Sequence, residues 1–334
     1  MGGMGTMTKL TSNLLKRHPL VTFKEYSLKV RDSRMKRLTV VVLVSAIAGI
    51  ALATWGGAAS AREAEQTAKK PKLPALPANI KERGRFNIAV KCDSPPFGYI
   101  DVRGRNAGFD VEIARWFSRF AFGKPTRVNF TCVTTPSREP ALTTDRVDMV
   151  IATFTYTPDR DTRIDFSRAY YKATGRFLVP NAAPDELLPQ LAGKTVATTS
   201  GSIYDRWVKN CFKDTKLVVT DSFTNALLAF RDKRSDALMW DDTVLLGIAV
   251  ADRTLKLTSD TFLALPYGIG IKQGNTALKA WVDSRLAVMK KRDTFNTILK
   301  NNVPARVFTT FQKNILRPNN NFGYTQGDAT TQCP

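Results

Sequence analysis

Apolar and polar residues along the chain predict two successive series of strands and helices. In the first series, short β-branched segments alternate with segments of helical spacing, over residues 86–92, 108–122, 126–133, 138–145 and 147–154. The same order restarts in a second series, over residues 195–199, 200–212, 216–220, 222–234 and 236–242. Strands that alternate with helices are typical of parallel sheets covered by helices. We therefore predict an α/β protein with two lobes, each a mostly parallel sheet flanked by helices.

The remaining segments connect or extend these two series. Residues 265–272 are Gly-rich and extended, and residues 276–300 have the apolar spacing of one long amphipathic helix. Residues 62–84 are charged and Pro-rich, which is typical of a linker, so the folded part is expected to begin near Arg85. Residues 305–334 are rich in Asn, Thr and Gly and are expected to form a C-terminal tail.

The N-terminal residues 1–61 have the pattern of an export signal. A basic stretch precedes an uncharged apolar run over residues 38–55, and small residues ending in Ala-Ser-Ala follow the run. That order is typical of a signal peptide with cleavage after Ala61, which would release the chain into the periplasm. The run has 18 residues, enough to span a bilayer, so an uncleaved chain would be anchored in the membrane.

Composition and charge narrow the classes of function. The chain has 334 residues and a formal net charge of +21. No zinc-finger spacing or other nucleic-acid motif accompanies the charge, which favours the attraction of small anions over nucleic-acid binding. The one histidine, His18, precedes the predicted cleavage site, so the exported chain would lack the histidine of Ser-His nucleophiles and of many metal sites. We expect no cofactor and no metal.

Four cysteines follow the export signal, at Cys92, Cys132, Cys211 and Cys333. An even number of cysteines in a chain bound for an oxidising compartment predicts disulfides, and three pairings are possible. Their spacing matches no zinc site.

Polar side chains gather at the predicted strand ends, where the ligands of open α/β sheets bind. Three cations, one anion, several hydroxyl groups and one aromatic ring follow the strands, and the candidates are Lys91, Phe97, Arg138, Thr153, Thr155, Arg160, Thr199, Ser200, Gly201, Ser202 and Asp241. Taken singly, each is explained as a surface charge, a helix cap or a core residue. Together, a helix start with free N–H groups, a bidentate arginine and a facing carboxylate fit an α-amino acid. Asp159 and Arg163, beside Arg160, are expected at the solvated surface.

Four motifs carry a resemblance to a known family. They are AGFDVEIARWF, VDMVIATFTYTPDRDTRIDFSRAYY, GKTVATTSGSIYDRW and SDALMWDD. In order and spacing they resemble the polar amino-acid-binding proteins of bacterial ABC importers, the extracellular solute-binding proteins of family 3. The resemblance implies the two-lobed fold of type II periplasmic binding proteins, joined by two crossover strands. Lobe 1 would comprise residues 85–179 and 268–304, and lobe 2 residues 180–267.

The resemblance also implies roles for individual residues. Arg160 would bind the ligand α-carboxylate with help from Thr155, and Thr153 would lie near the α-amino group. Asp241 would bind the α-ammonium. The turn from Thr199 through Ser202 would contact the ligand from lobe 2.

Side-chain specificity is expected from lobe 1. Lys91 and Arg138 fall where glutamate- and aspartate-binding members carry basic residues, and Phe97 would form a wall. The leading hypothesis is a monomeric periplasmic protein that closes around L-glutamate or L-aspartate and delivers it to the permease of an ABC importer. It would catalyse no reaction and bind no nucleic acid. Closure would use hinges near Leu178–Asn181 and Pro266–Ile269.

Two alternatives remain open. The fold that the resemblance implies also hosts exported dehydratases of cyclic carboxylic acids, which need a general acid or base in the cleft. An uncleaved apolar run would instead make the chain a membrane-anchored amino-acid sensor.

The two-lobed fold that the resemblance implies also predicts how the cysteines pair. Cys92 and Cys132 lie near the carboxyl ends of neighbouring first-lobe strands, which predicts that they pair. Cys211 would then pair with Cys333 and tether the tail to lobe 2.

Overall fold

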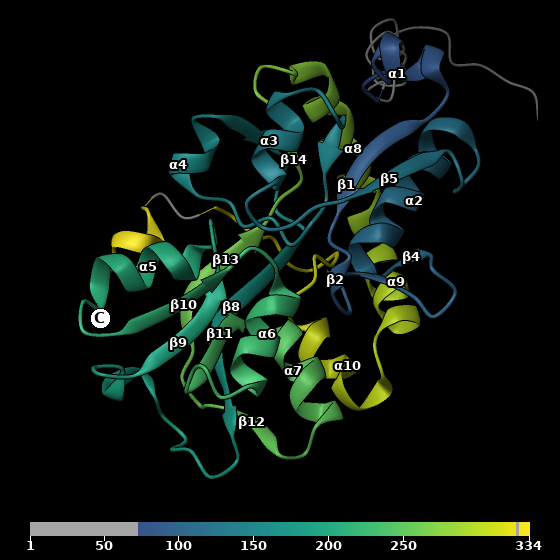
Figure 1. Ribbon diagram of the computed structural model, residues 1–334. Coiled ribbons are helices and arrows are strands. Elements are labelled where there is room, and N and C mark those ends of the chain that lie inside the picture. Colours follow the sequence, from purple (N-terminus) through teal and green to yellow (C-terminus); the bar gives the residue numbers. More distant parts are fainter. Residues whose placement is uncertain (1–72, 325–326) are drawn as a thin grey trace, which may run out of the picture. The chain divides into compact units, whose positions relative to one another are not determined.

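The computed structural model describes residues 73–324 and 327–334, so the predicted signal peptide lies outside the described residues. Two large sheets, each with its own helices, form most of the described part (Figure 1). Lobe 1 contains a five-stranded sheet and lobe 2 a six-stranded sheet, and a small third sheet consists of β2 (Asp93–Ser94), β3 (Gly98–Ile100) and β4 (Asn106–Ala107). Among the residues described, no helix is long and apolar enough to cross a membrane.

The sheet of lobe 1 has the strand order β5-β1-β6-β14-β7. Its strands are β1 (Phe86–Val90), β5 (Val128–Cys132), β6 (Met149–Val150), β7 (Ile164–Phe166) and β14 (Gly270–Lys272). The helices of this part of the chain are α1 (Ala78–Arg83), α2 (Phe109–Phe122), α3 (Arg138–Thr143), α4 (Pro158–Asp161), α8 (Thr276–Lys291) and α9 (Thr294–Asn302). Phe86 of β1, Phe117 of α2 and Trp281 of α8 are buried and in aromatic contact, which fastens both helices to the sheet.

The sheet of lobe 2 has the order β10-β9-β11-β8-β12, with β13 also paired to β8. Its strands are β8 (Tyr171–Pro180), β9 (Thr195–Thr199), β10 (Lys216–Thr220), β11 (Ala237–Asp241), β12 (Leu255–Leu257) and β13 (Phe262–Tyr267). A short 3₁₀ turn, η1 (Leu188–Gln190), precedes β9, and the helices are α5 (Ile203–Cys211), α6 (Phe223–Arg231) and α7 (Asp242–Ala251). The hydroxyl groups of Ser202 and Ser222 accept backbone N–H groups at the starts of α5 and α6, which fixes where these helices begin.

Both sheets are mixed, whereas the sequence predicted mostly parallel sheets. Parallel pairs join β1 to β5 and β6, and β9 to β10 and β11. β14 runs antiparallel to β6 and β7, and β8 runs antiparallel to β11, β12 and β13. The antiparallel strands are those next to the crossovers between the lobes, which a pattern of alternating strands and helices does not reveal.

The chain passes between the two sheets twice. β7 ends at Phe166 and β8 begins at Tyr171, and on the return β13 ends at Tyr267 and β14 begins at Gly270. The return crossover lies within the predicted hinge at residues 266–269. The other predicted hinge is wrong, because residues 178–180 pair with β12 at the far end of β8 and so belong to the sheet of lobe 2.

Three segments differ from the sequence predictions. The predicted helix over residues 276–300 is two helices, because Asp293 adopts a left-handed φ of 51° between α8 and α9. Part of the predicted linker is the helix α1, whose Ile80 is buried. The predicted tail contains the helix α10 (Ala305–Gln312) and the 3₁₀ turn η2 (Ala329–Thr331), and Val307 and Phe311 of α10 are buried in the core.

Two disulfides, the pairs that the sequence predicted, are present. Cys92–Cys132 joins the chain just after β1 to the end of β5, with 5.5 Å between the Cα atoms. Cys211–Cys333 joins the end of α5 to the C-terminal residues, with 5.1 Å between the Cα atoms. Both separations lie in the normal range for disulfides.

Candidate functional site

A small cavity lies where strand ends of the two lobes face each other. Six of the sequence candidates line it, together with five further residues, and the lining is Thr135, Arg138, Thr153, Thr155, Arg160, Ser202, Ile203, Tyr204, Trp240, Asp241 and Leu265. Its volume is about 20 Å³, which is room for about one water molecule. An amino acid would therefore enter only when the lobes separate or the lining side chains move.

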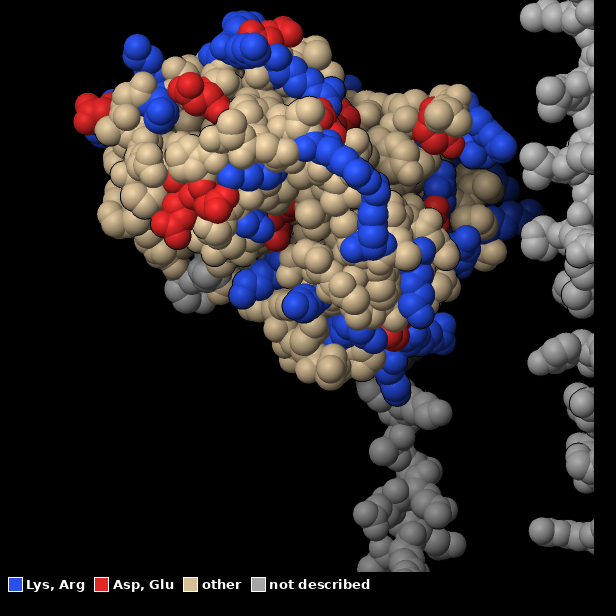
Figure 2. Space-filling model, turned by 90° about the horizontal axis from the view of Figure 1, so that it is seen from below, with Lys and Arg blue, Asp and Glu red and all other residues tan. Residues whose placement is uncertain are grey.

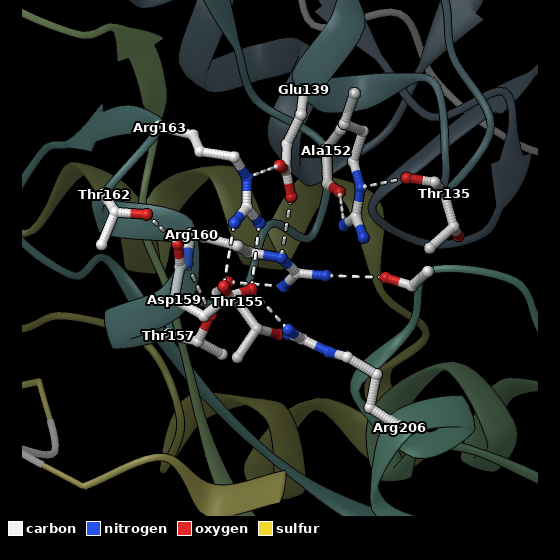
Figure 3. A network of polar contacts seen from close by, with 12 residues as sticks. Thr135, Glu139, Ala152, Thr155, Thr157, Asp159, Arg160, Thr162, Arg163 and Arg206 are labelled. Carbon is white, nitrogen blue, oxygen red and sulfur yellow. Dashed lines mark hydrogen bonds and ion pairs between the residues drawn. The ribbon is translucent and has the colours of Figure 1, made fainter. Parts of the chain in front are cut away.

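The short helix α4 holds Arg160 in the wall of this cavity. The hydroxyl group of Thr157 accepts the backbone N–H of Arg160 at 3.2 Å and so caps the helix. The side chain of Arg160 is buried, and its Nη1 donates to the Thr155 carbonyl at 2.8 Å. Its Nη2 donates to the Gly201 carbonyl of lobe 2 at 2.8 Å, and its Nε lies 3.3 Å from Glu139 (Figure 3). Arg160 thus contacts both lobes.

The guanidinium of Arg160 retains capacity for a ligand. It has five N–H donors, and its three contacts with the described residues leave two of them for a carboxylate. Burial, together with the charges of Arg138 and Arg206, lowers the pKa of Arg160 to about 9. The negative charge of a bound carboxylate would favour the protonated guanidinium and so oppose this shift.

Arg138 lies at the start of α3 with its guanidinium buried beside the cavity. Its Nε donates to the Thr135 carbonyl at 3.1 Å, and its Nη1 donates to the carbonyls of Ala152 and Thr153 at 3.2 and 3.0 Å. Its Cζ lies 4.5 Å from the centre of the Phe154 ring. Within residues 73–324 and 327–334, Nη2 donates no hydrogen bond and no carboxylate forms an ion pair with Arg138. Burial lowers the pKa of Arg138 to about 10.

Asp241 ends β11 and lines the cavity from lobe 2. It is buried, and its Oδ1 accepts the hydroxyl group of Tyr204 at 2.5 Å while its Oδ2 accepts that of Tyr267. Burial raises the pKa of Asp241 to about 6, although both tyrosine hydrogen bonds favour the ionised form. A ligand ammonium placed here would restore the charged carboxylate.

Thr153 and Thr155 line the cavity between β6 and α4. Thr153 has a positive φ of 44°, which is unusual for a β-branched residue. Its backbone N–H donates to Oδ2 of Asp110 at 2.8 Å, and Tyr170 donates to Oδ1 of the same carboxylate at 2.9 Å. Asp110 is fully buried, and burial raises its pKa to about 7. Asp110 therefore fixes the backbone that presents both threonines.

The predicted turn of lobe 2 reaches the cavity only in part. Ser202 lines the cavity and caps α5. Thr199, Ser200 and Gly201 are not among the lining residues, although the Gly201 carbonyl accepts the hydrogen bond from Arg160. In the described part of the chain, the buried Oγ1 of Thr199 has no hydrogen-bond partner.

Lys91 and Phe97 do not line the cavity, contrary to the sequence expectation. Nζ of Lys91 lies 3.3 Å from Asp93 and donates to the Thr135 hydroxyl group at 3.2 Å, so Lys91 lies behind a lining residue. Burial lowers its pKa to about 8. Phe97 is in the aromatic core, edge-on to Tyr171 with 4.9 Å between ring centres. Burial of the apolar Phe97 ring in this core lowers the free energy more than its placement in a polar cavity would.

Five lining residues were missed from the sequence, and they are Thr135, Ile203, Tyr204, Trp240 and Leu265. Trp240 directly precedes Asp241, and Ile203 and Tyr204 directly follow Ser202, so adjacency to candidates could have identified these three. The indole Nε1 of Trp240 is buried and has no hydrogen-bond partner among the described residues. Thr135 and Leu265 are not adjacent in sequence to any predicted site residue, so the sequence did not point to them.

The chemistry of the lining fits a zwitterion. It contains two guanidinium groups and one carboxylate, with hydroxyl groups between them. In residues 73–324 and 327–334, no group of three or more His, Cys, Asp or Glu side chains is arranged to hold a metal ion.

Comparisons with known proteins identify amino-acid-binding proteins as relatives of this chain. The chain is 30% identical over 268 residues to the ABC transporter glutamine-binding protein GlnH of Bacillus subtilis, covering 80% of this chain and 97% of that protein. It is 25% identical over 243 residues to the ABC transporter arginine-binding protein 1 of Escherichia coli, covering 69% of this chain and 97% of that protein. These relatives are named as binding proteins and not as enzymes.

Solved structures and a family model agree with these relatives. The solute receptor for L-cysteine of Neisseria gonorrhoeae superposes with a TM-score of 0.66 at 30% identity, covering 68% of this chain and 92% of that chain. The fold is therefore that of type II periplasmic binding proteins, as the sequence predicted. Residues 86–304 match the model of a single family. The chain belongs to the bacterial extracellular solute-binding proteins, family 3.

Proposed function

We propose that this protein captures an acidic amino acid, L-glutamate or L-aspartate, between its lobes and delivers it to the permease of an ABC importer. The observation that carries the proposal is the Nη2 group of Arg138, which donates no hydrogen bond within the part of the chain described. Arg138 lines the cavity, so this amino group is available to a second carboxylate. Arg160 would take the α-carboxylate, and Asp241 the α-ammonium.

The charges of the lining support an acidic ligand. Arg138 and Arg160 carry two positive charges and Asp241 one negative charge. A zwitterion with a neutral side chain would balance Arg160 and Asp241 and leave Arg138 buried without an anion. An unpaired charge in a closed cleft costs several kcal/mol, and a carboxylate on the ligand side chain removes that cost.

The relatives support an amino acid as the class of ligand. Relatives are named as binding proteins for glutamine, for arginine and, in Escherichia coli, for L-cystine, and the L-cysteine receptor is a structural neighbour. Glutamine, L-cystine and L-cysteine are neutral ligands and arginine is a cationic one, so a preference for an acidic ligand has to come from this chain's own residues. Arg138 would disfavour a cationic ligand by repulsion.

A neutral polar amino acid is the second candidate, and Lys91 favours it. The ion pair with Asp93 withdraws Lys91 from the cavity, which leaves one cation fewer for a distal carboxylate than the sequence predicted. The unpartnered Trp240 Nε1, within the residues described, could donate to an amide oxygen as well as to a carboxylate.

Surface charge and the export signal fit capture outside the cytoplasm. Lys and Arg side chains predominate over Asp and Glu on the face shown in Figure 2, in keeping with the net charge of +21. Such a surface raises the encounter rate with small anions. The pattern of residues 1–61 supports export to the periplasm with cleavage after Ala61.

Calorimetric titration of the chain from Arg62 with glutamate, aspartate, glutamine, arginine and cystine tests the proposal. Glutamate or aspartate should bind at least tenfold more tightly than the others. Tight binding of glutamine or cystine with no binding of the acids would refute the acidic preference and favour the second candidate.

A further inference from the structure

A chain of ion pairs lies beside Arg160 (Figure 3). Glu139 accepts from Nε of Arg163 at 2.9 Å, and Arg163 binds both carboxylate oxygens of Asp159 at 2.8 and 3.0 Å. Oδ2 of Asp159 in turn accepts from Nη1 of Arg206 at 2.6 Å. Glu139, Asp159 and Arg163 belong to lobe 1, whereas Arg206 lies on α5 of lobe 2.

Helix α4 is thus held to lobe 2 by two neighbouring residues. Arg160 reaches the Gly201 carbonyl just before α5, and Asp159 reaches Arg206 within α5. Only the first contact involves a residue that lines the cavity. The second lies at the rim, where the side chains of Arg206 and Asp159 are 30% and 43% exposed.

We propose that Arg206 is a positioning residue that retains the ligand from outside the cavity, by holding α5 of lobe 2 against α4 of lobe 1. The inference rests on the proposed function. Separation of the lobes breaks the Arg206–Asp159 pair, whereas the Arg163–Asp159 pair lies within lobe 1 and persists. A contact made only in the closed form lowers its free energy relative to the open form, so it slows ligand release.

The expected effect is small and specific. Partly exposed ion pairs contribute little, so loss of Arg206 should speed ligand release about two- to fivefold. Nε and Nη2 of Arg206 are buried and have no hydrogen-bond partner among the described residues. Removing these donors relieves a cost, so Arg206→Gln should leave the unfolding midpoint of the free protein unchanged or raise it. Arg206→Gln should therefore speed ligand release without lowering the unfolding midpoint of the free protein.

Arg163 offers a matched control. Arg163→Gln removes the same charge from the same carboxylate as Arg206→Gln, but its contacts lie within lobe 1. Release rates would be measured by stopped-flow with the amino acid that binds most tightly, at low and at high salt. Arg206→Gln should release the ligand two- to fivefold faster than Arg163→Gln, and high salt should reduce the difference because it screens exposed charges.

A second experiment measures the distance between the lobes without added amino acid. Spin labels on α3 and α6 would report the distance between the lobes, which should increase in Arg206→Gln and not in Arg163→Gln. Equal release rates in the two variants would overturn the inference. If no amino acid binds, the proposed function fails, and the distance measurement then decides: an unchanged distribution in Arg206→Gln overturns the inference, and a longer one supports it.

Discussion

Replacing Arg138 by glutamine separates acidic from neutral ligands. The substitution removes the cation whose Nη2 is available to the cavity, while the new amide can still donate to one of the three carbonyls that Arg138 now contacts. Loss of one partner from a buried, hydrogen-bonded charge pair costs about 2 to 4 kcal/mol, or roughly 30- to 700-fold in affinity. Glutamate and aspartate should lose that much, and glutamine less than about tenfold.

The assay is a pair of calorimetric titrations on the same preparation of each variant, one with glutamate and one with glutamine. The ratio of the two affinities is the readout, because a general distortion of the site would weaken both ligands alike. The unfolding midpoint serves as the control for folding. Arg138 contacts three carbonyl groups and the Phe154 ring, and glutamine keeps at most one of those hydrogen bonds, so the free energy of unfolding should fall by about 1 to 3 kcal/mol.

Two results would refute this reasoning. If glutamate and glutamine weaken equally, Arg138 supports the loop at Thr153 and does not recognise the side chain of the ligand. If neither affinity changes, the free Nη2 group does not meet the ligand at all.

Further expectations concern the other charged groups and one disulfide. Arg160→Ala should abolish calorimetric binding of every amino acid while the far-ultraviolet circular dichroism stays that of the parent protein. The affinity should fall about tenfold per pH unit below pH about 6, because protonated Asp241 no longer attracts an ammonium; pH-independent titrations would count against that role. The pKa of Asp110 is raised to about 7 from 3.8, so its contribution to stability is complete below pH about 4 and lost as the pH rises through 7; Asp110→Asn should flatten the fall in unfolding midpoint between pH about 4 and 7. Replacing Cys211 and Cys333 by serine opens a closed loop with a sequence separation of 122 and should lower the unfolding free energy by up to about 5 kcal/mol, as denaturant titration would show.

The sequence predicted the strands and most helices because their signals are local. The alternation of strands and helices identified β1, β5, β9, β10 and β11, and the carboxyl ends of these strands led to Arg138 and Asp241. β8 gave no such signal, although it is the longest strand in the described part of the chain and pairs with three others. Its position next to the crossover depends on contacts with distant segments.

The positions of Lys91 and Phe97 outside the cavity lining have a different cause. Both follow β1, and a strand end says only that a residue lies near the edge of the sheet. Asp93, two residues along, draws Lys91 into an ion pair, and the rings of Tyr171 and Tyr267 draw Phe97 into the core. Those tyrosines are more than seventy positions away in the sequence, so periodicity over a short window does not include them.

Residues 159–163 make a contact between the lobes that the sequence alone did not predict. The sequence indicated that Arg160 faces the ligand and that Asp159 and Arg163 lie at the solvated surface. Asp159 and Arg163 are indeed partly exposed, with side chains 43% and 45% accessible. Yet Asp159 also binds Arg206 of lobe 2, a partner 47 positions away. The helix α4 has four residues, which is too short for a periodic pattern to assign roles to its charged side chains. Among the residues described, Arg163 contacts only lobe 1 and Arg160 contacts both lobes, and this difference is visible only when the facing lobe is present.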